Sequence, residues 1–363
     1  MQKILLVSDL HIFTHKNSQE RLKNCLDVLD WVFQVAHDKQ IMDICFLGDL
    51  FHSRQKIDVA TYQWTFEIFC KWMHGLVRPN VYLLVGNHDM VHKFKPDICS
   101  IKPLASIDGV TVVDTPTTIK IGNHPVDFLP FTENPIEWLK NWSGHREILF
   151  GHIALDGAIL NSIYQTHAEV LVEHDGDMTV VNTDAFKDWE RVFLGHYHFG
   201  QKIENIEYLG SPLQLTFGEA FQEKHLIVYD LEVGKVEYVL NDFSPKHIVL
   251  SEGDIDKYDL TNNFIRIMVD DISSSELVEF RNDLLAQNIG SLDIRQKPKK
   301  EEDRQVVDDA LAAILHNNLI IDKYVECMDD LEQLGGLNKD KLLEIGKKII
   351  ESVTDKLNEK SKI

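Results

Sequence analysis

The sequence has few cysteines, and those that it has are not grouped. Five occur among 363 residues, an odd number, and no two stand in a Cys-x-x-Cys spacing. Disulfide scaffolds need pairs and structural zinc sites need closely spaced ligands, so neither is expected. Scattered buried thiols are typical of a reducing compartment, and we expect a cytoplasmic protein. The five are Cys25, Cys45, Cys70, Cys99 and Cys327.

Long apolar runs are also lacking. No run approaches the roughly 20 residues that a membrane-spanning helix needs. The first residues, MQKILLVSDLH, are apolar over only five positions before Ser8 and Asp9. This pattern predicts a buried strand and not a signal peptide, and we expect no membrane association.

Positive charge is scarce. The chain has 37 Lys and Arg against 58 Asp and Glu, a net charge of −21. This balance argues against a protein that binds a polyanion with its whole surface. It does not exclude chemistry on a polyanion whose charge is neutralised by bound cations, or with a partner protein that supplies the basic surface.

Short apolar runs alternate with amphipathic segments in the first part of the chain. Strands are expected at 3–7, 43–47 and 81–85, and helices at 18–38 and 58–75. This βαβαβ order predicts a parallel sheet with crossover helices. Beyond residue 108 the expected strands are closer together, and we expect much of that region to be antiparallel. They are 110–113, 117–121, 126–129, 147–150, 191–194, 201–209, 225–230 and 235–240.

The chain is expected to divide into three parts. Residues 1–244 form the large α/β domain. Residues 245–298 form a small domain with strands at 263–269 and 292–295 and a helix at 274–287. Residues 299–363 comprise the end of a charged linker and amphipathic helices.

Five polar clusters follow directly after expected strands. Taken singly, each is an ordinary turn or a surface pair. Together they supply only metal-ligand residue types at the ends of apolar strands, where ligands of open α/β sheets gather. Four of the five begin with glycine, which allows a sharp turn close to a ligand. The clusters are SDLH (8–11), GDLFH (48–52), GNHD (86–89), GH (151–152) and GHYH (195–198).

The chemistry of these side chains favours a pair of metal ions. Two carboxylates, one amide and four imidazoles without thiolate suit Mn²⁺, Fe²⁺ or Zn²⁺ better than a lone Mg²⁺. They are too many for one ion, but two ions bridged by one carboxylate would use them all. Such a pair acts on phosphate esters.

The motifs DxH, GDxFH, GNHD, GH and GHxH, in this order, resemble the calcineurin-like metallophosphoesterase superfamily. The GDLFH form and the stretch IEYLGSPLQLTFGEAFQEKHLIVYD (206–230) are similar to the SbcD-type DNA-repair nucleases. The resemblance covers roughly residues 1–245. It implies an α/β fold, a four-layer α-β-β-α metallophosphoesterase sandwich, with a small α+β capping domain and a C-terminal helical tail.

The resemblance also implies roles for individual residues. Asp49 bridges the two metal ions, and His88 faces the scissile phosphate. Asp89 fixes the tautomer of His88, and His52 touches the phosphate or the nucleic-acid end. The other ligands of the first ion are Asp9, His11 and His198. The other ligands of the second ion are Asn87, His152 and His196.

These roles imply a two-metal DNA nuclease, an exonuclease with possible endonuclease activity that acts at DNA ends in recombination, repair or replication. Mn²⁺ is the favoured ion, with Mg²⁺ or Fe²⁺ as alternatives. The implied partners are DNA and an SbcC-type coiled-coil ATPase. Two other functions stay open: a small-molecule cyclic-nucleotide phosphodiesterase, and a non-enzymatic assembly module.

Two segments predict protein contacts. The helix expected at 58–75 is apolar nearly all round, and the family forms two-fold dimers through this region. We therefore expect a homodimer, although both apolar stripes could instead be covered within one chain. The helices expected at 305–363 carry apolar stripes, and we expect them to dock on the base of a coiled coil.

Overall fold

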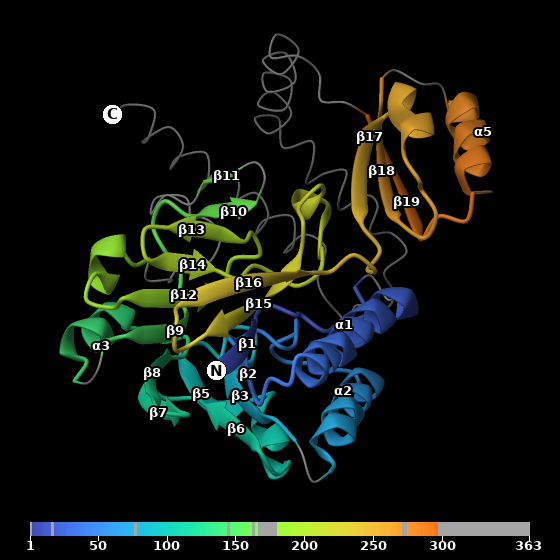
Figure 1. The fold of residues 1–363 in the computed structure, drawn as a ribbon. Coiled ribbons are helices and arrows are strands. Elements are labelled where there is room, and N and C mark those ends of the chain that lie inside the picture. The colour runs from blue at the N-terminus through green and yellow to red at the C-terminus, as the bar shows by residue number, and fades with distance from the viewer. Residues whose placement is uncertain are drawn as a thin grey trace, which may run out of the picture. The chain divides into compact units, whose positions relative to one another are not determined.

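The computed structural model describes residues 2–15, 18–75, 78–143, 146–161, 164–165, 180–270, 274–285 and 287–296. Contacts divide the chain into residues 1–295 and residues 296–363. The described part of the first unit has a mixed α/β fold with two six-stranded sheets (Figure 1). The helices expected at 305–363 lie outside the described residues. No helix in the described ranges is both long enough and apolar enough to cross a membrane.

The first sheet has the strand order β16-β15-β1-β2-β3-β6. Strands β1, β2 and β3 are parallel neighbours, as the βαβαβ pattern predicted. Strand β6 also pairs in parallel with β3, although antiparallel pairing was expected for much of the region beyond residue 108, and β15 and β16 join antiparallel. Apart from the β15–β16 hairpin, each pair of neighbouring strands joins residues far apart in the sequence. The strands are β1 (Lys3–Val7), β2 (Asp43–Phe46), β3 (Asn80–Leu84), β6 (Val110–Val113), β15 (His225–Asp230) and β16 (Lys235–Leu240).

Two crossover helices, α1 (Gln19–Asp38) and α2 (Val59–Met73), lie side by side (Figure 1). Each begins at a capping side chain. Ser18 accepts a hydrogen bond from the Arg21 amide, and Asp58 accepts one from the Thr61 amide at 2.9 Å. These caps satisfy amides that have no partner within the helix.

The second sheet has the strand order β13-β14-β12-β9-β8-β7. The expectation of antiparallel pairing is wrong for its central strands, because β8, β9, β12 and β14 are parallel neighbours. Parallel neighbours need crossovers, and α3 (Pro135–Asn141) is part of one of them. The strands are β7 (Thr117–Ile121), β8 (His124–Leu129), β9 (Ile148–His152), β12 (Arg191–Gly195), β13 (Gln201–Ile203) and β14 (Ile206–Tyr208).

Successive residues of the strands separate into distinct apolar layers. On β1, Leu5 packs with the α1 and α2 side chains, while Ile4 faces the core between the two sheets. On β9, Phe150 belongs to the core between the sheets, and Leu149 packs with Leu139 of α3. Two-residue periodicity thus builds a helix–sheet–sheet–helix order.

A small third sheet has the order β17-β18-β19 and one described helix, α5 (Ser274–Leu285). Its strands are β17 (His247–Ser251), β18 (Phe264–Val269) and β19 (Ser291–Gln296). The sequence predicted β18, α5 and β19 but missed β17. Two hairpins complete the described strands: β4 (Met90–His92) with β5 (Lys95–Cys99), and β10 (Ile159–Asn161) with β11 (Tyr164–Gln165).

Candidate metal centre

The five polar clusters come together because they follow five strands of the two large sheets. The loops after β1 and β2 run in register: the Asp9 amide donates to the Gly48 carbonyl at 3.1 Å, and the His11 amide donates to the Asp49 carbonyl at 3.0 Å. The Leu47 carbonyl then accepts from Nδ1 of His152, which ends β9 on the second sheet, at 2.7 Å. The site therefore spans both sheets.

The backbone of this centre is strained at its polar residues. Asp9, His11, Asp49 and His196 have φ values of 54°, 47°, 54° and 101°. Side chains other than glycine rarely adopt this left-handed region, and such conformations cluster at functional sites. The fold holds these four side chains in positions that a relaxed loop would not give them.

Two glycines are required by close approach. Gly48 has φ of 99°, and a Cβ there would collide with the imidazole of His152. A Cβ on Gly86 would collide with the carboxylate of Asp49. The glycines that open the motifs are therefore needed for the site to close around these side chains.

The first cluster consists of Asp9, His11 and His198, whose ligand atoms all lie within 4.8 Å of one another. Nε2 of His11 is 3.0 Å from Nε2 of His198 and 3.9 Å from the Asp9 carboxylate. Asp9 is also anchored, because both of its oxygens accept from the His196 amide. These are the residues predicted to share the first ion.

The second cluster consists of Asp49, His152 and His196, again with ligand atoms within 4.8 Å of one another. Oδ1 of Asn87 lies 3.0 Å from Nε2 of His152 and 3.0 Å from Nδ1 of His196. The predicted ligands of the second ion thus lie around one point. All of them except His196 are at most 5% exposed.

Asp49 belongs to the second cluster and also faces the first. Its Oδ2 is 3.6 Å from Nε2 of His11 and 3.4 Å from Nε2 of His152. Its Oδ1 accepts from the His88 amide at 2.8 Å. The carboxylate is therefore positioned to be shared by both clusters.

Burial and mutual charge shift the ionisation of these groups. Burial opposes the ionisation of Asp49, but the charge and hydrogen bond of His152 outweigh it and hold the pKa of Asp49 well below its ordinary value. Burial lowers the pKa of His152, whereas Asp49 and Asp9 raise it to about 9. Burial, followed by the charge of His152, lowers the pKa of His196 to about 3. Burial also lowers the pKa of His11 well below its ordinary value.

The donor set fits a cation. Nδ1 of His152 donates to the Leu47 carbonyl, so in the neutral ring Nε2 carries a lone pair. That lone pair faces the Asn87 and Asp49 oxygens at 3.0 and 3.4 Å. Acceptors that face one another repel unless a proton or a metal ion lies among them. The raised pKa of His152 has the same cause, because a proton on Nε2 would relieve the same repulsion.

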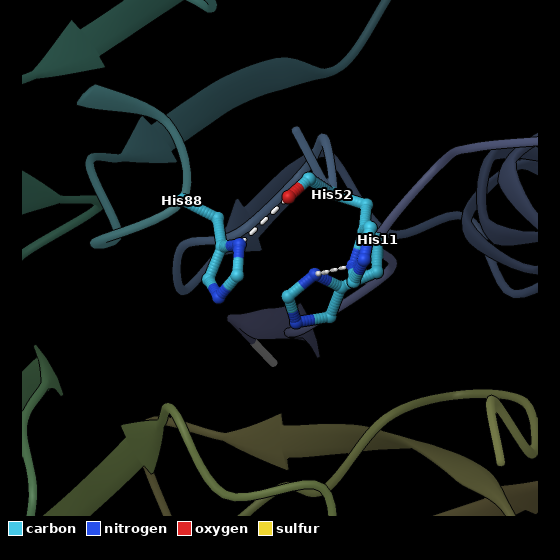
Figure 2. Close-up of side chains that lie close together, drawn as sticks. All are labelled: His11, His52 and His88. Atoms are coloured by element: carbon cyan, nitrogen blue, oxygen red, sulfur yellow. Dashed lines mark hydrogen bonds between the residues drawn. The ribbon is translucent and has the colours of Figure 1, made fainter. Parts of the chain in front are cut away.

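His88 and His52 lie beside the first cluster. Nδ1 of His88 donates to the main-chain carbonyl of His52 at 2.7 Å, and Nδ1 of His52 is 3.3 Å from Nδ1 of His11 (Figure 2). The rings of His52 and His88 are stacked, with centroids 5.5 Å apart. The two predicted substrate-facing histidines are thus held together by main chain.

Asp89 does not have the predicted contact. The sequence assigned it to fix the tautomer of His88, but that role falls to the His52 carbonyl. Oδ2 of Asp89 accepts from the amides of Gly86 and Asp49, each at 2.9 Å, and Oδ1 has no hydrogen-bond partner in the described ranges. Burial and the charge of Asp49 raise its pKa to about 7. Asp89 therefore joins the loops that follow β2 and β3, and it does not orient the His88 ring.

The sequence reasoning also missed a buried polar group behind His198. Glu219 is 2% exposed, and its Oε1 lies 3.3 Å from Nδ1 of His198. Its Oε2 pairs with Nζ of Lys224 at 2.7 Å. Both residues lie in the 206–230 stretch that carried the family resemblance, which was the available signal.

Comparison with known sequences identifies the class. The sequence model of the family described as calcineurin-like phosphoesterase matches residues 2–200, more than half of the chain. The chain belongs to this family. Its fold and the clustering of His, Asp and Asn at strand ends are what the motifs predicted.

Particular relatives are nucleases by name. The chain is 24% identical over 291 residues to exonuclease subunit 1 of Enterobacteria phage T4, covering 78% of this chain and 80% of the phage protein. It is 24% identical over 288 residues to the SbcD subunit of nuclease SbcCD from Escherichia coli K12, covering 66% and 67%. It is 25% identical over 269 residues to the Bacillus subtilis 168 protein of the same name, covering 64% and 67%.

Proposed function

We propose that this phosphoesterase is a DNA nuclease that depends on two divalent metal ions, with Mn²⁺ as the favoured ion. The observation that carries the proposal is the pair of ligand clusters, both of which are in reach of the Asp49 carboxylate. Paired ions that share a ligand are typical of enzymes that hydrolyse phosphate esters. The nuclease names of the relatives support DNA as the substrate.

The residues that would hold the ions are those of the two clusters. Asp9, His11 and His198 would hold one ion, and Asn87, His152 and His196 the other, with Asp49 between them. When bound, the ions would lower the pKa of a water molecule and offset negative charge that develops on the phosphate. We keep Mg²⁺ and Fe²⁺ as alternative ions, because the oxygen and nitrogen donors also suit them.

His88 is proposed to act on the substrate itself. Because Nδ1 is held by the His52 carbonyl, the proton-carrying atom available to the substrate is Nε2 on the opposite side of the ring. In the imidazolium form Nε2 donates to a phosphate oxygen or protonates the leaving oxygen. His52, which is half-buried and stacked on His88, is proposed as a second phosphate contact.

A hairpin beside the second cluster favours a nucleic-acid substrate. Phe94, at the tip of the β4–β5 hairpin, stacks on Phe131 with centroids 5.5 Å apart, and Phe131 lies 6.1 Å from the ring of His196. Lys93 and Lys95 flank Phe94. Aromatic rings with adjacent basic side chains are the means by which proteins bind bases and phosphates.

We also propose the partners. The bacterial relatives are named as a subunit of a nuclease, which supports an SbcC-type coiled-coil ATPase as a partner of this chain. That partner would supply the basic surface that a chain of net charge −21 lacks. A homodimer through the segment 58–75, which contains α2, and a cytoplasmic location belong to the same proposal.

The decisive experiment compares substrates and metals. The full chain is assayed on linear duplex DNA, single-stranded DNA and a cyclic dinucleotide, in Mn²⁺ and in Mg²⁺, with and without the ATPase. We expect Mn²⁺-dependent cleavage of DNA that is lost in Asp49→Ala. Cleavage of only the cyclic dinucleotide would favour a small-molecule phosphodiesterase. Mn²⁺-dependent activity unchanged in Asp49→Ala would contradict the site, and no activity with the ATPase present would favour an assembly module.

A further inference from the structure

A buried carboxylate stands behind His198, on the side of the ring away from the first cluster. Glu219 ends the short helical turn η3 (Phe217–Glu219), and its Oε1 lies 3.3 Å from Nδ1 of His198. A carboxylate can only accept, so Nδ1 is the donor. The other nitrogen, Nε2, then carries the lone pair, and it faces Nε2 of His11 at 3.0 Å.

Glu219 is itself held in one orientation. Its Oε2 accepts from Oγ of Ser211 at 2.9 Å and from the Leu215 amide at 3.3 Å, and it pairs with Nζ of Lys224 at 2.7 Å. Lys224 is 6% exposed and also donates to the main-chain carbonyl of His198 at 2.8 Å. Lys224 therefore contacts both Glu219 and His198.

We propose that Glu219, fixed by Lys224 and Ser211, is a positioning residue of the metal centre that sets the tautomer and orientation of His198. This inference rests on the proposed function, because it assigns His198 to an ion. Partners that hold the outer nitrogen of a ligating histidine are commonly worth 10- to 100-fold in metal affinity. A purely structural ion pair would instead stabilise the 211–224 segment and leave metal affinity unchanged.

The substitution Glu219→Gln tests the tautomer directly. The donors around Oε2 would take the amide oxygen, which leaves the amide NH₂ facing Nδ1 of His198. A donor at that position requires Nδ1 to accept, and the proton moves to Nε2, where it blocks the ion. Glu223→Gln is the matched control, because Glu223 is exposed and the change removes the same charge four residues away.

The measurement is calorimetric titration of Mn²⁺ into the metal-free full-length proteins, with thermal unfolding recorded alongside. We expect two sites in the wild type, about 10- to 100-fold weaker binding at one of them in Glu219→Gln, and no change in Glu223→Gln. Affinities within twofold of the wild type at both sites of a folded Glu219→Gln protein would overturn the inference.

If the single variant does not fold, Glu219→Gln with Lys224→Met replaces it, because the pair is then removed without an unpaired buried charge. The Ser211 and Leu215 donors remain, so the same loss at one site is expected, and wild-type affinity would again overturn the inference. A wild-type protein that takes up no Mn²⁺ would overturn the proposed metal function, and with it the role of Glu219.

Discussion

At the scale of single residues, three imidazole rings share one arrangement. Nδ1 of His88, His152 and His198 faces the His52 carbonyl, the Leu47 carbonyl and the Glu219 carboxylate, respectively. In each ring Nε2 is left for a cation or a substrate. The protein therefore sets the chemistry of its histidines with fixed acceptors, two of which are main chain.

His88→Ala tests the assigned role of a single ring. We expect the turnover of a phosphodiester to fall about 10²- to 10⁴-fold, because a positioned proton donor is lost. Mn²⁺ binding measured by calorimetry should stay unchanged, because His88 is assigned to the substrate and not to either ion, although its ligand atom also lies within 4.8 Å of those of His11 and His52. His37→Ala, on the exposed surface of α1, is the control. Loss of a Mn²⁺ site in His88→Ala would show that the ring is a ligand.

The residue types of the site could be predicted from sequence, but their outer partners could not. Asp, Asn and His after apolar strands can be recognised because strand ends of a sheet share one edge. The contact of His152 with Leu47 joins residues 105 apart, and no local pattern encodes it. No local pattern encodes the contact of His88 with the His52 carbonyl either, which takes the place of the contact expected with Asp89.

At the scale of elements, strand positions were predicted better than strand pairing. β1, β6, β7, β12, β15 and β16 fall within one residue of the expected ranges. The expected strand at 201–209 is two strands, because Glu204 has φ of 56° and the chain turns there. Pairing depends on crossovers such as α3, and close spacing in sequence does not reveal them.

Helix α2 provides a test of self-association. Val59 is 80% exposed and Trp64 is 41% exposed, while Phe69 and Met73 pack into the core. The exposed apolar side chains are what a two-fold contact would cover. We expect a dimer by light scattering at micromolar concentration and a predominantly monomeric Trp64→Glu protein. Val233→Glu, at an exposed turn, should stay dimeric, and a strictly monomeric wild type would contradict the proposal.

Strand β17 begins with a histidine whose burial predicts acid sensitivity. His247 lies between the rings of Phe217 and Phe264, and its Nδ1 has no hydrogen-bond partner in the described structure. Burial, followed by the charge of Arg21, lowers its pKa to about 3. The unfolded chain, with an ordinary pKa near 6.5, therefore binds more protons below that pH, and stability falls as the pH decreases.

Urea unfolding at pH 7, 6 and 5 measures this contribution. Well below pH 6.5, one such proton costs about 1.4 kcal/mol of unfolding free energy per pH unit. We expect the unfolding free energy of His247→Gln to fall less steeply with decreasing pH than that of the wild type, by up to that amount. The unfolding free energy of His37→Gln should follow the wild type. Equal slopes for His247→Gln and the wild type would show that His247 is protonated in the folded state.

At the scale of the whole molecule, catalysis and partner binding should be separable. The sequence assigns partner binding to residues 305–363 and the ligand clusters lie between residues 9 and 198. Deleting 305–363 should therefore abolish co-purification with the coiled-coil ATPase and leave hydrolysis of bis(p-nitrophenyl) phosphate within about twofold of the full chain. Retained ATPase binding would refute the assignment.

The 211–224 segment has neighbours on two sides. Glu219 contacts His198, Gln214 accepts from the His247 amide at 2.6 Å, and Phe217 lies under the Arg266 guanidinium at 4.0 Å. Coupling between two events in one protein is reciprocal. If a displacement of the small sheet changes the affinity for the ions by some factor, then binding of the ions changes the equilibrium of that displacement by the same factor. Binding of ions at the metal centre would then change the position of β17 and β18, which lie outside the substrate site.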